Sequence, residues 1–255
     1  MLMLISPAKT LDYETPATTA SYSLPDYLDK SAELIAVVKK KSYRDLMKLM
    51  QTSQKIAELS VKRFSQWQLP FNPNNAKQAV LAFKGDVYTG LDATALAEDR
   101  LEYAQSHLRI ISGLYGLLRP LDLMQPYRLE MGLRLKTNKG RTLYQFWGEQ
   151  ITDALNSLLE KQDEPVLINL ASNEYFKSIQ KKNLEGRLIT PEFKDWKNGK
   201  YKMIGFFAKK ARGMMVRYAI DNNIQKGEEL QNFDYDGYSF NHELSHAGKW
   251  VFCRG

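Results

Sequence analysis

The sequence predicts an α+β (mixed α/β) fold, with residues 1–255 forming a single compact domain on a mixed β-sheet. Three observations lead to this prediction. Segments with helical periodicity and segments with strand character alternate in an irregular order, which is typical of mixed sheets. No internal repeat, low-complexity tract or linker divides the chain. A chain of 255 residues with 44% hydrophobic content can also bury a large core.

The N-terminal half is expected to alternate between helices and short buried strands. Apolar residues recur at helical spacing in four segments, which span residues 25–40, 42–50, 52–67 and 94–110. Ser42 can cap the second of them. Met1–Ile5 and Ala79–Phe83 are short apolar runs, and we expect each to be a strand. The first would be buried or at a sheet edge, and the second would be buried.

The C-terminal half contains the clearest strand and hairpin signals. Thr142–Lys161 has the pattern of an amphipathic helix, and Val166–Ala171 that of a buried strand. Further helices are expected at residues 173–179 and 208–222. Asn198-Gly199 predicts a type I′ hairpin turn between strands at 187–196 and 200–207. A second hairpin is expected to join 238–240 to 250–254.

The net charge of +7 is unevenly distributed along the chain. Between Lys177 and Arg217, twelve Lys or Arg face three acidic residues, so the rest of the chain has a net charge of −2. Such a basic segment indicates a polyanionic partner. The alternative is a solvated lysine-rich face, which is common in soluble proteins.

Composition also indicates the cellular compartment. No apolar run approaches the roughly 20 residues of a membrane span, and Met1–Ile5 lacks the basic leader of a signal peptide. Cys253 is the only cysteine, so no internal disulfide can form, and its position suggests a structural strand end. We therefore expect a cytoplasmic protein that does not associate with membranes.

The segment from Ser112 to Gly132 has the composition of an anion or nucleic-acid contact. Two glycines permit a tight turn whose backbone N–H groups can point outward. Two arginines add cationic donors, and two tyrosines add flat faces with hydroxyl tips. These residues are Gly113 and Gly116, Arg119 and Arg128, and Tyr115 and Tyr127.

Several polar residues follow predicted strands and could meet in one cleft. Lys9, Lys84, Asn169 and Glu174 come at or after strand ends, with Arg119 and Arg128 on the wall of the cleft. Two lysines and two arginines together would favour phosphate groups. The alternative is that each is a separate exposed charge on its own loop.

The same residues allow an enzymatic hypothesis, although no standard catalytic motif is present and the sequence leans against catalysis. Lys9 or Lys84 would be the nucleophile or the electrostatic clamp on a phosphorylated or nucleic-acid substrate. Asp86, Glu130 or Glu174 would be the acid or base.

Two further patterns carry weaker hypotheses. His242-Glu-Leu-Ser-His246 matches a zinc signature, but it lies between strand-like segments, so we expect a hairpin loop and neither a metal nor a cofactor. Direct iron binding through carboxylates alone remains a weaker alternative. Four aromatic residues are interleaved with the basic segment, which suits base stacking but also suits a core; they are Tyr201, Phe206, Phe207 and Tyr218.

Taken in order, several blocks of the chain resemble the YaaA family of bacterial peroxide-stress-response proteins. The blocks are Ser6–Leu11, Phe83–Gly90, Ser112–Asp122, Gln125–Met131, Leu143–Trp147, Asn169–Ser172, Glu174–Lys177 and Ala208–Gly213. The resemblance implies a cytosolic protein that limits damage linked to free iron during hydrogen peroxide stress. It also implies a positively charged cleft and a helix-hairpin-helix-like element suited to DNA.

The resemblance places that DNA-binding element at Leu101–Leu123, with its hairpin at Gly113–Gly116. The backbone at Gly113, Leu114, Tyr115 and Gly116 would then contact phosphates. Cationic side chains would extend the contact, and these are Arg119, Arg128, Lys209, Lys210 and Arg212. The expected partner is double-stranded or distorted DNA, bound by a monomer with low sequence specificity.

Overall fold

The first residues of the chain form the centre of the main β-sheet. In the computed structural model, which describes all residues 1–255, strand β1 (Leu2–Ile5) is completely buried. It pairs in parallel with β5 (Leu108–Ser112) on one side and with β8 (Val166–Asn169) on the other. The side chains on both faces of these strands are buried and mostly apolar, as expected for parallel strands inside a sheet.

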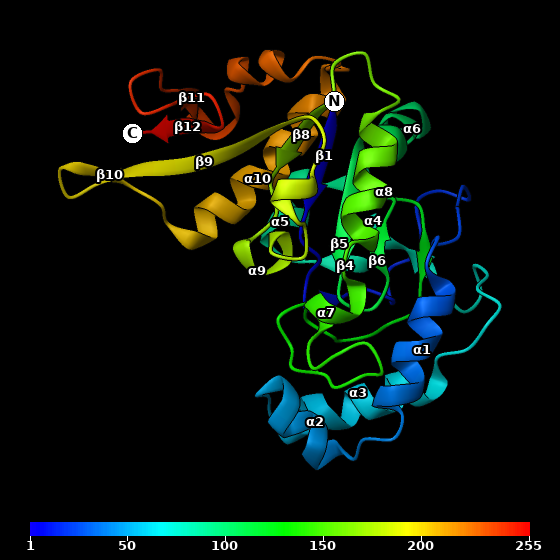
Figure 1. Cartoon of the computed structure of the whole chain (residues 1–255). Helices are drawn as coiled ribbons and strands as arrows, with labels where there is room; N and C mark the ends of the chain where they lie inside the picture. Colours follow the sequence, from blue (N-terminus) through cyan, green and yellow to red (C-terminus); the bar gives the residue numbers. More distant parts are fainter.

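The complete sheet has eight strands in the order β11-β12-β9-β8-β1-β5-β6, with β10 paired to β9. The central pairs from β12 to β5 are parallel, and the pairs at the margins are antiparallel. The remaining strands of this sheet are β6 (Gly116–Leu118), β9 (Arg187–Lys197), β10 (Lys200–Lys202), β11 (Ser239–Phe240) and β12 (Lys249–Arg254). The predicted mixed sheet in one domain is confirmed (Figure 1).

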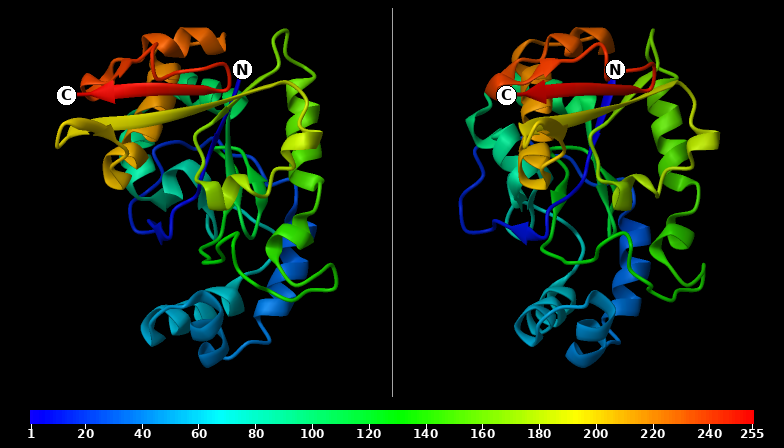
Figure 2. Two further views of the ribbon diagram at one scale, coloured as in Figure 1. Left: turned by 60° about the vertical axis from the view of Figure 1, so that its left-hand side comes forward. Right: turned by 90° about the vertical axis from the view of Figure 1, so that its left-hand side faces the viewer.

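Helices lie on both faces of the sheet. Figure 2 shows α8 on one face and α6 with α10 on the other, while α2 and α3 stand apart at one end of the molecule. The helices are α1 (Leu28–Val38), α2 (Tyr43–Met50), α3 (Gln54–Gln66), α4 (Ala79–Ala82), α5 (Asp86–Leu91), α6 (Glu98–His107), α7 (Leu143–Trp147), α8 (Gln150–Leu159), α9 (Asn173–Phe176) and α10 (Gly205–Asp221). None of them has the length and apolar character that crossing a membrane requires.

Four short strands lie outside the main sheet, in two antiparallel pairs. They are β2 (Thr10–Leu11) with β4 (Phe83–Lys84), and β3 (Lys77–Gln78) with β7 (Leu123–Met124). The predicted cap of α2 is present, because the Ser42 side chain accepts a hydrogen bond from the Asp45 N–H and the Asp45 carboxylate accepts one from the Ser42 N–H. This reciprocal pair satisfies two otherwise free donors at the start of the helix.

Four predicted elements differ from the structure. The strand predicted at 200–207 ends at Lys202, because the chain enters helix α10 at Gly205. Ala79–Phe83 is a short helix, α4, followed by the first residue of β4, because a short apolar run suits a buried helix as well as a strand. The helix predicted at 94–110 ends at His107, and the chain continues as β5. The helix predicted at 142–161 is two helices, separated at Gly148 by a φ of 54°.

The helix-hairpin-helix element expected at Leu101–Leu123 is also wrong. After α6 the chain forms β5 and then β6, which pair antiparallel with Ser112 opposite Gly116. The run Leu108–Ser112 is buried along its whole length, so it joins the sheet beside β1 instead of leading into a second helix. Two helices joined by a short turn occur elsewhere, at α2 and α3, where Gln51 takes the left-handed conformation.

Candidate functional site

Two loops meet where the parallel strands β1 and β8 end. The Ser172 N–H donates to Ser6 Oγ at 2.8 Å, and Ser6 Oγ donates to Ser172 Oγ at 3.2 Å. The Tyr88 hydroxyl donates to the Ser6 carbonyl oxygen at 3.1 Å. Ligands of open α/β sheets bind at the carboxyl ends of the strands. These hydrogen bonds therefore fix the loop that carries Lys9 at an edge suited to binding.

A buried carboxylate, Glu130, lies beside Lys9. Glu130 Oε1 accepts a hydrogen bond from Arg128 Nε at 3.1 Å, forms an ion pair with Arg128 Nη2 at 3.0 Å, and lies 3.5 Å from Lys9 Nζ. Glu130 is only 6% exposed, whereas the Lys9 side chain is 64% exposed. The carboxylate is thus held inside by the arginine, and the lysine extends from it toward solvent.

The second oxygen of the Glu130 carboxylate has no partner. Oε2 is buried and makes no hydrogen bond. A cavity of about 10 Å³, close to the space that one water molecule needs, is lined by Lys9, Glu130, Tyr127 and Tyr175, among others. Burial raises the pKa of both tyrosines, so their hydroxyl groups remain neutral hydrogen-bonding groups. This cavity provides a place for a donor to the free oxygen.

Lys9 and Glu130 also border a larger open hollow of about 710 Å³. We name it the upper hollow; its other charged residues are Lys48, Arg134 and Glu174. Glu174 is oriented by the Gly132 N–H, which donates to its Oε1 at 3.0 Å. The end of α2 forms one wall, so the hollow lies between the helix pair and the loops at the strand ends.

Lys84 lies in a neighbouring hollow of about 450 Å³, which we name the lower hollow. Thr10 of β2 lies opposite Lys84 of β4, so the residue after Lys9 lines this second space. The remaining charged lining residues are Asp12, Glu14, Lys62 and Arg63. Lys84 Nζ approaches Asp12 Oδ2 at 4.0 Å, a distance that leaves the ammonium largely in solvent.

Asp12 is strongly stabilised as a carboxylate. Its pKa is lowered to about 2, first by the hydrogen bond from the Thr15 N–H and then by that from the Thr15 hydroxyl. The buried Lys77 donates to the Asp12 and Thr15 carbonyl oxygens at 2.9 and 2.8 Å, and burial lowers its pKa. Lys77 therefore serves to hold the loop that borders the lower hollow.

The glycine-rich hairpin does not face either hollow. Gly113, Leu114, Tyr115 and Gly116 are all buried. Ser112 Oγ accepts hydrogen bonds from the Leu114 N–H at 3.2 Å and the Tyr115 N–H at 2.9 Å. In this structure the turn therefore offers no phosphate-binding donors at Leu114 or Tyr115, which corrects the expectation from the glycine spacing.

Gly113 has a packing role that affects the site. A Cβ atom there would lie 2.1 Å from the Leu129 carbonyl oxygen and 3.2 Å from the Glu130 carbonyl carbon. The missing side chain thus allows the Leu129–Glu130 backbone to lie directly against β5. Gly116 takes a φ of 71° under the Trp147 ring. Both glycines serve the interior, and Gly113 helps to place Glu130.

Comparisons with known proteins agree with the blocks noted in the sequence. A family model described as "Peroxide stress protein YaaA" matches residues 1–244. The chain is 57% identical over 258 residues to a UPF0246 protein of Azoarcus sp. (strain BH72), covering all of this chain and 99% of the relative. It is 58% identical over 254 residues to a UPF0246 protein of Shewanella pealeana, and the match covers 100% of this chain and 99% of the relative. The chain belongs to the YaaA family.

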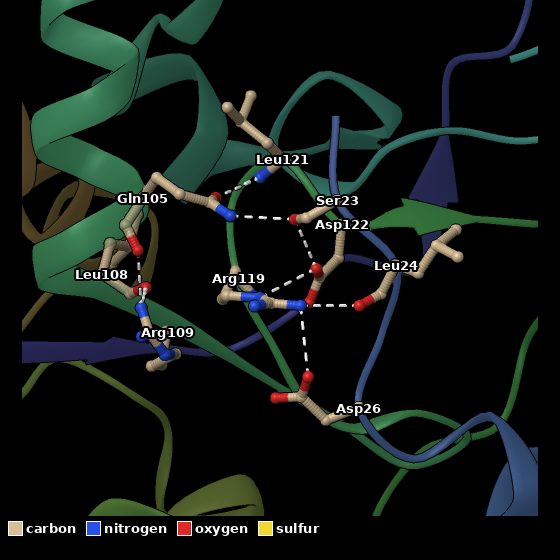
Figure 3. A network of polar contacts seen from close by, with 9 residues as sticks. All are labelled: Ser23, Leu24, Asp26, Gln105, Leu108, Arg109, Arg119, Leu121 and Asp122. Atoms are coloured by element: carbon tan, nitrogen blue, oxygen red, sulfur yellow. Dashed lines mark hydrogen bonds and ion pairs between the residues drawn. The ribbon is translucent and has the colours of Figure 1, made fainter. Parts of the chain in front are cut away.

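In this YaaA-family chain, Arg119 is part of an internal polar network (Figure 3). Its Nε donates to Asp122 Oδ1 at 3.0 Å, and its Nη2 donates to the Leu24 carbonyl at 2.6 Å and to Asp26 Oδ1 at 3.2 Å. Burial raises the pKa of Asp122, whereas Ser23 and Arg119 favour its ionised form. Arg119 thus joins three segments of the fold and lies in neither hollow.

Asn169 and Asp86 also lie outside both hollows. Asn169 Oδ1 accepts a hydrogen bond from the Ala171 N–H at 3.1 Å, and its amide group donates to Thr190 at 3.5 Å. Asp86 is the first residue of α5 and lines neither hollow. Of the residues selected from the sequence, the strand-end residues Lys9 and Glu174 therefore share the upper hollow with the candidate acid or base Glu130, and Lys84 lies in the lower one.

The basic residues selected on α10 form a separate surface. Lys209 is exposed, and Lys210 pairs with Asp236 at 3.8 Å. Arg212 is partly buried, and burial lowers its pKa. None of the three lines either hollow. A DNA track that joins α10 to the hollows is therefore not supported by the lining of these spaces.

The His242–His246 segment forms the predicted hairpin loop between β11 and β12, so its two histidines are not on one face of a helix. Across the chain, no group of three or more His, Cys, Asp or Glu side chains comes together to hold a metal ion. Cys253 is buried in β12, where burial raises the pKa of its thiol, as expected for a structural cysteine.

Four cationic residues of the hollows were missed in the sequence. They are Lys48, Lys62, Arg63 and Arg134. Lys48 and Lys62 lie on the solvent-facing sides of two ordinary amphipathic helices, so nothing local distinguishes them from surface lysines. Only the tertiary arrangement, in which α2 and α3 face the loops after β1, gives them a place beside Lys9.

Proposed function

We propose that this YaaA-family protein acts in the hydrogen peroxide stress response and limits damage linked to intracellular free iron, through DNA binding along its two hollows. The partner is double-stranded or distorted DNA, bound by a cytoplasmic monomer without strong sequence preference. Family membership supports the stress role. The DNA-binding part is supported by the charged side chains of the hollows.

The observation that carries the proposal is the excess of cationic groups in the two adjoining hollows. Six basic side chains face four acidic ones, and Glu130 is additionally paired with Arg128. The basic residues are Lys9, Lys48, Lys62, Arg63, Lys84 and Arg134. Exposed lysines on either side of a groove suit the phosphates of a DNA backbone, which carry most of the affinity in nonspecific binding.

The test is fluorescence anisotropy of a labelled duplex with a variant carrying Lys9→Gln, Lys48→Gln and Lys84→Gln. We expect the variant to bind more weakly and to show a salt slope that is less steep by about 2–3, because each lost phosphate contact removes about 0.9 from the slope. The matched control removes three exposed lysines that line neither hollow, with the substitutions Lys161→Gln, Lys182→Gln and Lys226→Gln.

The control variant matters because any loss of positive charge weakens DNA binding slightly. If the two triple variants lose the same small amount of affinity, the hollows have no special role and the proposed binding site is refuted. If wild-type protein does not bind duplex at low salt, the DNA-binding proposal as a whole is wrong.

A second candidate function is an enzyme that acts on a phosphorylated or nucleic-acid substrate in the upper hollow. The unpartnered Glu130 oxygen next to a water-sized cavity favours it, since a carboxylate with a free oxygen can accept a proton from a bound group. Lys9 Nζ lies 3.5 Å from this carboxylate, so its role would be that of an electrostatic clamp on phosphate.

The enzyme candidate has a direct test. Wild-type protein and Glu130→Gln are incubated with duplex DNA that contains an abasic site, with and without borohydride. Strand cleavage that disappears in Glu130→Gln would support this candidate, and a trapped adduct would show that Lys9 or Lys84 acts as a nucleophile. If the protein produces neither strand cleavage nor a trapped adduct, this form of the enzymatic hypothesis is refuted.

A further inference from the structure

The hairpin of β9 and β10 projects beyond the rest of the sheet. Strand β12 pairs with β9 only as far as Asp195, opposite Arg254, and β8 pairs with β9 only at residues 187–189. The tip, Trp196–Lys202, extends past both neighbours and is named the finger (Figures 1 and 2). Asn198 and Gly199 form its turn with φ values of 53° and 76°, as in the predicted type I′ hairpin.

The finger carries an exposed tryptophan. Trp196 is 53% exposed, whereas the other three tryptophans of the chain are at most 6% exposed. Tyr201 lies directly opposite on β10, with ring centroids 5.0 Å apart and planes at 72°. The Tyr201 hydroxyl donates to the Gly255 carbonyl at 3.2 Å. A large aromatic surface is thus kept in a defined position without contributing to the core.

The finger also concentrates positive charge. Lys197 and Lys200 lie directly opposite each other across the two strands, and like charges in that position destabilise a β-hairpin. Neither of them, nor Lys202, takes part in any of the ion pairs of the structure. From Trp196 to Ile220 the sequence has no Asp or Glu. An anionic partner would relieve this repulsion.

We infer that the finger binds single-stranded nucleic acid, with an unpaired base stacked on Trp196 and phosphates beside Lys197, Lys200 and Lys202. Single-stranded nucleic acid has an exposed base face and a negative phosphate at each nucleotide. The base faces match the exposed tryptophan of the finger, and the phosphates match its lysines. An acidic protein segment would satisfy the lysines but offers no flat faces for the exposed tryptophan. The finger thus contributes a contact that paired DNA cannot make.

This inference rests on the proposed DNA binding, and it names the form of DNA that binds best. The hollows contact the backbone of either form, and the finger adds stacking only where bases are unpaired. The protein should therefore bind a duplex with an internal bubble more tightly than a fully paired duplex of the same length. Stacking of one base contributes enough to change affinity by roughly fivefold or more.

The experiment compares wild type, Trp196→Ala and Tyr22→Ala in anisotropy titrations against paired duplex, bubbled duplex, oligo(dT) and oligo(rU). Tyr22 is 50% exposed but lies outside the finger and lines neither hollow, so it controls for loss of exposed aromatic surface. We expect Trp196→Ala to weaken binding of bubbled and single-stranded forms by at least fivefold and to leave paired duplex within twofold. The ratio of the affinities for oligo(dT) and oligo(rU) shows whether the finger prefers single-stranded DNA or RNA.

A second measurement follows the fluorescence of Trp196 itself, since it is the one exposed tryptophan. Stacking of a base should quench the emission of wild type on addition of oligo(dT), and Trp196→Phe should abolish that quenching. Emission that responds to anionic lipid vesicles but not to oligo(dT) would overturn the inference, as would an equal loss on all DNA forms in Trp196→Ala. Quenching of wild type by oligo(dT), together with unchanged duplex affinity in the triple lysine variant, would refute the hollows and leave the finger in place.

Discussion

Gly113→Ala is the substitution that separates the structural role of the glycine-rich hairpin from a role in binding phosphate. The new Cβ atom would lie 2.1 Å from the Leu129 carbonyl oxygen, whereas ordinary contact begins at 3.4 Å. The backbone of Leu129, which is 2% exposed, would have to retreat by about 1 Å inside a packed region.

The expected loss of unfolding free energy is about 3 kcal/mol, since overpacking a well-packed region costs about 1–3 kcal/mol and the clash here is with backbone. For a chain of this size the melting temperature should fall by roughly 6–12 °C. Urea unfolding monitored by circular dichroism measures the change. Gly205→Ala is the matched control, because nothing lies within 4 Å of its Cβ position at the start of α10.

Two results would refute this reasoning. Gly113→Ala with a stability within 0.5 kcal/mol of wild type would show that the close approach to Leu129 does not constrain the fold. Unchanged stability combined with weaker DNA binding would restore the sequence-based interpretation, in which the hairpin backbone contacts phosphate. A similar loss in Gly205→Ala would show that added methyl groups destabilise the protein irrespective of position.

Further predictions concern the charged groups of the site. Glu130→Ala should lower the free energy of unfolding by about 3 kcal/mol in urea titrations, because it leaves Arg128 partly buried without its partner, whereas Lys9→Met should change it by less than 1 kcal/mol. Asp12 has its folded pKa lowered to about 2, so it stabilises the protein above pH 4 and loses that effect as pH falls toward 2. Acid titrations should therefore show a flatter stability profile in Asp12→Asn between pH 4 and 2. Ser42→Ala should cost about 1 kcal/mol of thermal stability through loss of the α2 cap.

Local chemistry in the sequence was sufficient to predict much of the fold. Ser42 marked the start of α2, and Asn198-Gly199 marked the turn of the finger, because each signal depends on residues a few positions apart. Met1–Ile5 was correctly predicted as a strand, since its short run of apolar residues is typical of a buried strand. The mixed sheet followed from the irregular order of such elements.

The errors arose where distant segments determine the structure. Leu108–Ser112 continues a helical pattern in sequence, but it pairs with β1 more than a hundred positions away and becomes a strand. Gly113 suggested a phosphate-binding turn, and its reason for being glycine is the Leu129 backbone. For the site, Lys9 and Glu174 were selected from strand ends and Glu130 as a candidate acid or base, whereas Lys48 could be found only from the position of α2.

Lysine footprinting with DNA tests the central proposal most directly. Exposed lysines are acetylated briefly in the absence and presence of duplex DNA at low salt, and mass spectrometry measures the modification of each one. Binding in the hollows predicts that Lys9, Lys48 and Lys84 become protected, while Lys161 and Lys226 react as before. Protection confined to lysines outside the hollows, with Lys9, Lys48 and Lys84 unchanged, would contradict the proposed site.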